Sequence, residues 1–133
     1  MKIEEVEGIG PAFAEKLSAV GITTTEDLLA RGGKKSERVA IAIETGINEG
    51  MLLEWANHVD LMRIKGVGSE FSDMLEAAGV DSPAELAQRS AKNLAETMGE
   101  LDMARNTTRR IPTETMVADW IEEAKTMERA VEH

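Results

Sequence analysis

The sequence predicts an all-α protein in which one helical unit is used twice. Two observations carry this prediction. Apolar residues recur at helical spacing along the chain, and no alternating run of β-branched residues is bounded by turns as a strand would be. Residues 8–31 (GIGPAFAEKLSAVGITTTEDLLAR) also match residues 66–89 (GVGSEFSDMLEAAGVDSPAELAQR), with eight of 24 positions identical. The four aromatic residues form matched pairs as well, Phe13 with Phe71 and Trp55 with Trp120.

In the first copy, glycine, proline and threonine predict where about five helices begin and end. Pro11 suits the first turn of a helix, where its missing N–H costs nothing, and Gly21 suits the end of that helix. Thr23 and Glu26 fit a capping box at the start of the next helix. The predicted helices cover residues 2–7, 11–20, 24–31, 36–45 and 49–64.

The helix predicted over residues 49–64 joins the two copies. It has an apolar stripe on one helix face, formed by Leu52, Trp55, Val59 and Met62, and no breaker occurs before Gly66. We therefore expect a first repeat over residues 1–57 and a second over residues 58–133. Because a unit of about 60 residues buries little surface alone, we expect one compact body.

The second copy repeats the same pattern of signals. Gly79 ends its hairpin helix, and Ser82-Pro83-Ala84-Glu85 fits a capping box with proline at the first helical position. Ser90 begins the next helix, and extra length follows around residues 99–112. We expect the closing helix to start at Thr113 and to present one apolar side, formed by Met116, Val117, Trp120, Ala124, Met127 and Val131.

Composition argues against several classes of function. The net charge of −10 opposes nucleic acid, whose binding depends on neutralised phosphates, and both copies carry more acidic than basic residues. There is no cysteine, and His58 and His133 lack metal-ligand spacing. Because no nucleophile or phosphate-loop motif is present either, we expect no enzyme, no cofactor and no metal. Without a long apolar run or a signal sequence, we expect a cytoplasmic protein that does not bind membranes.

Two segments resemble the helix-hairpin-helix motif. Val6-Glu7-Gly8-Ile9-Gly10-Pro11 begins the first and Ile64-Lys65-Gly66-Val67-Gly68-Ser69 the second, each followed by a helix, a glycine and another helix. Nearly the whole chain resembles an uncharacterised bacterial family of tandem helix-hairpin-helix domains, catalogued as a domain of unknown function. The resemblance implies two pseudo-repeated helix-hairpin-helix (SAM-like) units of about five helices each, joined by a shared helix. It implies no settled activity.

In nucleic-acid-binding members of the helix-hairpin-helix class, the hairpin contacts a phosphate through backbone amides. Carried over by position, this anion site would comprise Gly8, Ile9 and Gly10 in the first repeat, and Gly66, Val67, Gly68 and Ser69 in the second. The flanking charges differ, since acidic residues precede the first hairpin and basic residues the second: Glu4, Glu5 and Glu7 against Arg63 and Lys65. A structural role for both glycine turns is the alternative, because a sharp turn needs glycine whatever it binds.

Other clusters have a structural and a functional interpretation. Arg105, Arg109 and Arg110 could grip a phosphate or an acidic partner, or could balance nearby carboxylates. A second basic cluster is interpreted as solvated surface: Arg31, Lys34, Lys35 and Arg38. Both tryptophans are predicted to be core anchors rather than platforms for stacked bases, and the later methionines are predicted to fill the core.

These observations favour a non-enzymatic interaction module that binds an unknown protein partner or self-associates through an acidic helical surface. The alternative is sequence-nonspecific nucleic-acid binding through the second hairpin. The two hypotheses differ in electrostatics, because nucleic-acid binding needs a positive patch and weakens steeply with salt. Binding of a protein partner instead needs an exposed apolar patch.

Overall fold

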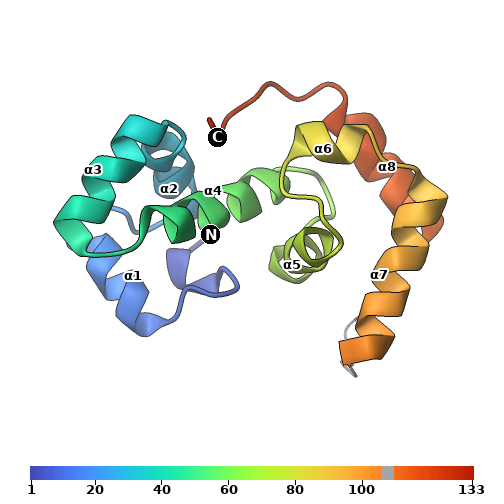
Figure 1. The fold of residues 1–133 in the computed structure, drawn as a ribbon, viewed down its shortest axis with the longest axis horizontal. Helices are drawn as coiled ribbons and strands as arrows, with labels where there is room; N and C mark the ends of the chain where they lie inside the picture. The colour runs from blue at the N-terminus through green and yellow to red at the C-terminus, as the bar shows by residue number, and fades with distance from the viewer. Residues whose placement is uncertain (106–109) are drawn as a thin grey trace. The chain divides into compact units, whose positions relative to one another are not determined.

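The computed structural model describes residues 1–105 and 110–133 (Figure 1). In the described residues all regular elements are helices, and one isolated β-bridge pairs Lys2 with Thr24. The all-α prediction is therefore confirmed. In chain order the elements are the 3-10 helix η1 (Ile3–Glu5) and the α-helices α1 (Pro11–Ser18), α2 (Thr25–Gly32), α3 (Lys35–Thr45), α4 (Glu49–Leu61), α5 (Ser69–Ala77), α6 (Pro83–Ala87), α7 (Ala91–Arg105) and α8 (Glu114–Ala124).

The chain divides into two compact units. Unit 1 contains Met1–Asp60 and also Arg129–His133, and unit 2 contains Leu61–Glu128. The change of unit thus falls in the last turn of α4, three residues beyond the boundary drawn from the sequence. The chain then returns to unit 1 after α8, a feature for which the sequence analysis offered no signal.

The core of unit 1 is built from the apolar faces of η1 and α1 to α4. Its buried members are Ile3, Val6, Ile9, Ala14, Leu17, Ile22, Leu28, Ile41, Ile47, Leu52, Trp55 and Val59. Helix α2 begins with a capping box in which Thr24 Oγ1 accepts from the Asp27 N–H at 3.1 Å and Asp27 accepts from the Thr24 N–H at 3.2 Å. The capping box predicted for Thr23 and Glu26 is therefore shifted by one residue, because Thr24 is the last residue with extended backbone before the helix.

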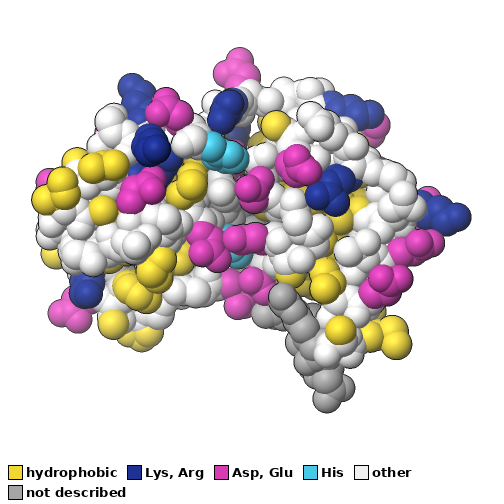
Figure 2. All heavy atoms as spheres, viewed as in Figure 1, with side chains coloured by type: hydrophobic (Ala, Val, Ile, Leu, Met, Phe, Trp, Pro, Cys, Tyr) yellow, Lys and Arg dark blue, Asp and Glu magenta, His cyan; other side chains and the backbone are white. Residues whose placement is uncertain are grey.

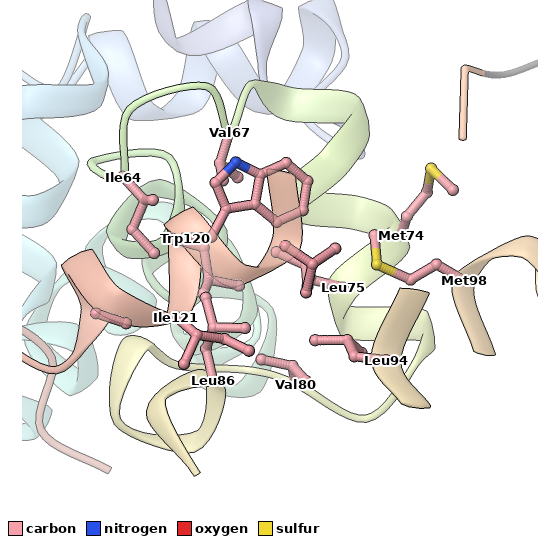
Figure 3. Packing of buried hydrophobic residues seen from close by; sticks show 13 residues of the cluster. Ile64, Val67, Met74, Leu75, Val80, Leu86, Leu94, Met98, Trp120 and Ile121 are labelled. Carbon is pink, nitrogen blue, oxygen red and sulfur yellow. The ribbon is translucent and has the colours of Figure 1, made fainter. Parts of the chain in front are cut away.

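Unit 2 has a separate core, formed where α6 and α7 pack on α8 and α5 packs on α7 (Figure 3). Its buried members are Leu61, Ile64, Val67, Met74, Leu75, Val80, Leu86, Leu94, Met98, Val117, Trp120, Ile121 and Ala124. Met74 and Met98 are thus core residues as predicted, and Met116 and Met127 pack against the same cluster. In contrast, Met103 is 80% exposed.

Several helices end earlier than the sequence predicts, among them η1 at Glu5 rather than residue 7 and α1 at Ser18 rather than residue 20. Helix α4 stops at Leu61 rather than continuing to residue 64, because Ile64 N–H turns back to the Leu61 carbonyl at 3.1 Å. Helix α8 stops at Ala124, where the Lys125 and Met127 N–H groups close its last turn. Val131 is therefore not part of the apolar side of α8, and it is buried in unit 1 instead.

An arginine contacts the turn that follows α1 in unit 1 and the turn that follows α5 in unit 2. Arg31 Nη1 donates to the Val20 carbonyl in unit 1, and Arg89 Nη2 donates to the Gly79 carbonyl at 3.1 Å in unit 2. These carbonyls lie in the turns two residues beyond the ends of α1 and α5. This role explains why arginine occupies both aligned positions.

Candidate functional site

The candidate site consists of two glycine turns, defined here as the first turn (residues 8–10) and the second turn (residues 66–68). Gly8 and Gly66 have φ of 90° and 88°, in the left-handed region that favours glycine. In each turn the second glycine, Gly10 or Gly68, has extended backbone and is the N-cap of the following helix, α1 or α5. The two backbones therefore follow the same path into a helix start.

A tryptophan indole lies directly beneath each turn. A Cβ atom added at Gly8 would lie 3.5 Å from Trp55 Nε1, and one added at Gly66 would lie 3.3 Å from Trp120 Nε1. Figure 3 shows the indole of Trp120 beside Val67, among the buried side chains of unit 2. The tryptophans are 3% and 2% exposed, so the prediction that they are core anchors is confirmed.

Each indole also packs against the phenylalanine of its own unit. The ring centroids of Phe13 and Trp55 are 5.1 Å apart, and those of Phe71 and Trp120 are 5.2 Å apart. Both pairs have tilted planes, at 62° and 51°, which is the favourable range for aromatic rings. The two tryptophans are therefore buried in the cores and offer no exposed face on which a base could stack, whereas Phe13 and Phe71 are partly buried and pack against them.

The central amide of each turn donates to the chain itself. Ile9 N–H donates to the Val6 carbonyl at 3.0 Å, and Val67 N–H donates to the Ile64 carbonyl at 3.0 Å. The side chains of Ile9 and Val67 are buried as well. In this conformation neither amide is available to a phosphate, although the resemblance implied that both would be donors.

The surroundings of the first turn are acidic. Glu4 and Glu5 are exposed and Glu7 is half-buried, and the Glu5 carboxylate accepts from the Lys2 N–H at 3.0 Å. Three carboxylates next to the turn repel a phosphate. Gly8 and Gly10 are exposed, so the backbone of the turn reaches the surface, but the charge around it disfavours an anionic ligand.

The second turn combines basic side chains with carboxylates, among them the exposed Glu70 in the first turn of α5. Arg63 and Lys65 have exposed side chains, Gly66 and Gly68 are exposed, and Ser69 is half-buried at the start of α5. However, the backbone N–H of Lys65 donates to both oxygens of Glu123, each at 3.2 Å. This residue of α8 thus places a negative charge against the backbone that leads into the turn.

The arginines of the longer segment in unit 2 are only partly described. Arg110 is exposed. Arg109 and the side chain of Arg105 lie outside the described residues, so the predicted grip of three arginines has no described geometry.

The other basic cluster is exposed at Arg31, Lys34 and Lys35, as the sequence predicts, but not at Arg38. Lys34 and Lys35 are exposed, but the Arg38 side chain is fully buried, at 0% exposure. Its guanidinium donates to the carbonyls of Gly32 and Gly33, to Glu49 and to the backbone of Glu132. The prediction failed because Arg38 faces the core side of α3 together with Ile41, three residues later.

The chain matches a family model over residues 7–127, and the model is described as a domain of unknown function (DUF4332). The chain belongs to this family. A search of curated proteins and a search of solved structures each found no significant match. Family membership covers both turns and both tryptophans, but it assigns no chemistry to either turn.

The described helices were also compared with the length and hydropathy that a membrane span requires. No helix in residues 1–105 or 110–133 is long and apolar enough to cross a bilayer.

Proposed function

We propose that this DUF4332 domain is a non-enzymatic interaction module of the cytoplasm that binds a protein partner or self-associates. We also propose that its two units are copies of one helix-hairpin-helix-like unit. The matched φ angles of Gly8 and Gly66 support the second proposal, as do the indoles of Trp55 and Trp120 beneath them.

The observation that carries the proposal is the carboxylate at the second turn. Glu123 accepts the N–H of Lys65 through both oxygens at 3.2 Å, beside the basic side chains that would have to attract a phosphate. The second turn is the position most favourable for a phosphate, and it carries an acidic group. The net charge of −10 also opposes the binding of nucleic acid. A protein partner requires no such positive field.

Helix α3 supplies a surface suited to a protein partner. Val39 is 42% exposed and Ile43 is 79% exposed, and their spacing of four residues puts them on one face of the helix. Figure 2 shows hydrophobic side chains gathered over α3. Exposed apolar side chains that adjoin on a surface are typical of interaction sites.

Capture of partners by variants of the full chain tests this proposal. We expect the wild-type protein to retain a partner, or to form complexes with itself, and Ile43→Glu to lose this binding. Met103→Glu is the matched control, because Met103 is equally exposed but lies on α7 of unit 2. Binding that is lost equally in both variants, or absent from the wild-type protein, would contradict the role of α3.

The alternative function is sequence-nonspecific nucleic-acid binding through the second turn. One feature favours it: Arg63 and Lys65 are exposed next to Gly68, where a Cβ would meet nothing within 4 Å, so a ligand can approach the backbone. The binding residues would be those predicted above for this turn, with Arg105, Arg109 and Arg110 as further candidates.

Fluorescence anisotropy with labelled duplex DNA, single-stranded DNA and structured RNA separates the two functions. The alternative requires binding that persists near physiological salt and is lost in Lys65→Glu but kept in Lys34→Glu, since Lys34 belongs to unit 1. The leading proposal expects no binding at physiological salt and no difference between the two variants.

A further inference from the structure

The segment Arg129–His133, called the return segment here, follows unit 2 in the chain but belongs to unit 1. It makes specific contacts there. Glu132 N–H donates to the Gly33 carbonyl at 2.7 Å, and Glu132 Oε1 accepts from the Lys35 N–H at 3.4 Å. The side chain of Val131 is buried, and His133 Nε2 lies 3.0 Å from Asn57 Oδ1. The segment therefore docks through backbone, apolar and polar contacts together.

The receiving groove lies between the end of α2 and the start of α3, and the buried Arg38 forms its base. Arg38 Nη1 donates to the Gly32 and Gly33 carbonyls at 2.8 and 3.0 Å, and Nε donates to Glu49 at 3.0 Å. Its Nη2 donates to the backbone carbonyl of Glu132. A buried guanidinium needs all its partners, because an unpaired buried charge is costly. One of those partners comes from the return segment.

Gly33 indicates that the groove is shaped for close approach of a peptide backbone. Its φ of −68° and ψ of −35° are helical values that any residue adopts, so its backbone does not require glycine. However, a Cβ at this position would lie 2.6 Å from the carbonyl oxygen of Ala130. The absent side chain makes room for the return segment.

Glu132 places its carboxylate at the N-terminus of α3, where the helix dipole favours a negative charge. A pocket of about 500 Å³ adjoins this contact and is lined by both sides of the groove: Leu29, Ala30, Gly33 and Lys34 with Arg129 to His133. The groove thus matches an extended segment with a buried aliphatic residue followed by glutamate.

We propose that the groove also accepts the return segment of a second copy of this chain, so that two copies associate by exchanging it. The proposal rests on the self-association in the proposed function. The occupant that the groove fits is this sequence, because the hydrogen bonds of Glu132 and His133 join the five-residue return segment to the rest of unit 1. Only residues 125–128 connect it to α8. Exchange of a short element on a short connection rebuilds the same contacts between copies, which is a low-cost route to a dimer.

Disulfide trapping between two full-length copies tests this proposal, because the chain has no cysteine of its own. One copy carries Ala30→Cys on the groove side of the pocket, and a size-tagged copy carries Ala130→Cys on the segment side. A control mixture replaces Ala30→Cys by Ala12→Cys, an exposed position on α1. We expect the groove pair to form interchain disulfides at least roughly tenfold faster than the control pair, as a preformed contact raises effective concentration.

A second variant separates docking from misfolding. Gly33→Ala, added to the Ala30→Cys copy, blocks the groove while keeping a helical backbone that alanine adopts readily. We expect it to lower trapping to the control rate with unchanged helix content. Equal rates for the groove and control mixtures, or trapping that Gly33→Ala leaves unchanged, would overturn the exchange. If the exchange fails in this way but Ile43→Glu still abolishes binding of a partner, the proposed function remains supported without the exchange.

Discussion

The two glycine turns agree in backbone and differ in charge. Gly8 and Gly66 have the same left-handed φ, the indoles of Trp55 and Trp120 lie beneath them, and the same internal hydrogen bond crosses each turn. Carboxylates flank the first turn, whereas the second is flanked by the basic side chains of Arg63 and Lys65 together with Glu70 and Glu123. The shared geometry is thus explained by packing inside each unit, and it does not require a common ligand.

The starts of helices α2 and α6 give a second comparison. Thr24 and Asp27 form a complete capping box at α2. At α6, Ser82 accepts from the Glu85 N–H at 3.1 Å, but the Glu85 carboxylate pairs with Arg89 instead of turning back to the cap. The aligned acidic residues therefore have different partners: Asp27 completes the capping box in unit 1, whereas Glu85 pairs with Arg89 in unit 2.

Removing the indoles is the strongest way to break the comparison of the turns. Trp55→Ala and Trp120→Ala should each lower the free energy of unfolding by about 3 to 5 kcal/mol, because a buried aromatic side chain leaves a cavity. Chemical denaturation of both variants measures this loss. A small loss in one variant and a large one in the other would show that the two turns are not supported alike.

Adding a side chain within the turns tests their backbones. Gly66→Ala should cost about 1 to 2 kcal/mol, because alanine is strained at φ of 88°. Its Cβ would also crowd Trp120 Nε1 at 3.3 Å. Gly68→Ala is the matched control, since its φ is −92° and its Cβ would meet nothing within 4 Å. Equal losses in thermal denaturation would contradict this account of the first glycine.

The two caps should differ in their contribution to stability. Ser82→Ala should cost about 1 kcal/mol through the lost acceptor for the Glu85 N–H. Thr24→Ala should cost at least as much, because Asp27 then caps without its reciprocal partner. Urea denaturation measures the free energy of unfolding of both variants. A smaller loss for Thr24→Ala than for Ser82→Ala would contradict an additional stabilisation by the complete capping box.

The smallest expected effect is a pH dependence that belongs to unit 1. The backbone N–H of Thr23 and the side chain of Thr24 hold the pKa of Asp27 below its ordinary value. A carboxyl whose pKa is lower in the folded state stabilises the fold above its unfolded pKa, and this stabilisation is lost as the pH falls through the folded pKa. Asp27→Asn should therefore flatten the acid side of the stability profile. An unchanged slope would contradict the assignment.

Much of the fold could be predicted from residues whose effect is local. Pro11, Ser82 and Thr113 mark helix starts that the structure has at α1, α6 and α8. The helix ends were harder to predict, because the last turns of α4 and α8 are closed by local hydrogen bonds that compete with continued helix. Periodicity in the apolar residues gives no signal for that competition.

The candidate site was predictable in position but not in chemistry. The aligned glycines locate both turns, and the matched tryptophans indicate core anchors, but the position of the indoles against the turns comes from the structure. The contact between Lys65 and Glu123 joins residues 58 positions apart, and the contacts of Arg38 reach Glu132, 94 positions away. No local pattern specifies such pairs, because each of these residues is of a charged type that usually lies on the solvated surface.

The sequence by itself determined that the chain is helical, where most helices begin, and that Trp55 and Trp120 are core anchors; it did not indicate that they belong to two separate cores. These features follow from capping, proline geometry and apolar spacing, which act over a few residues. Only the tertiary structure decided that Arg38 is buried and that the return segment docks in unit 1. Those outcomes depend on which carbonyls and carboxylates from distant parts of the sequence form hydrogen bonds with a charged group. The packing of the formed helices determines these partners.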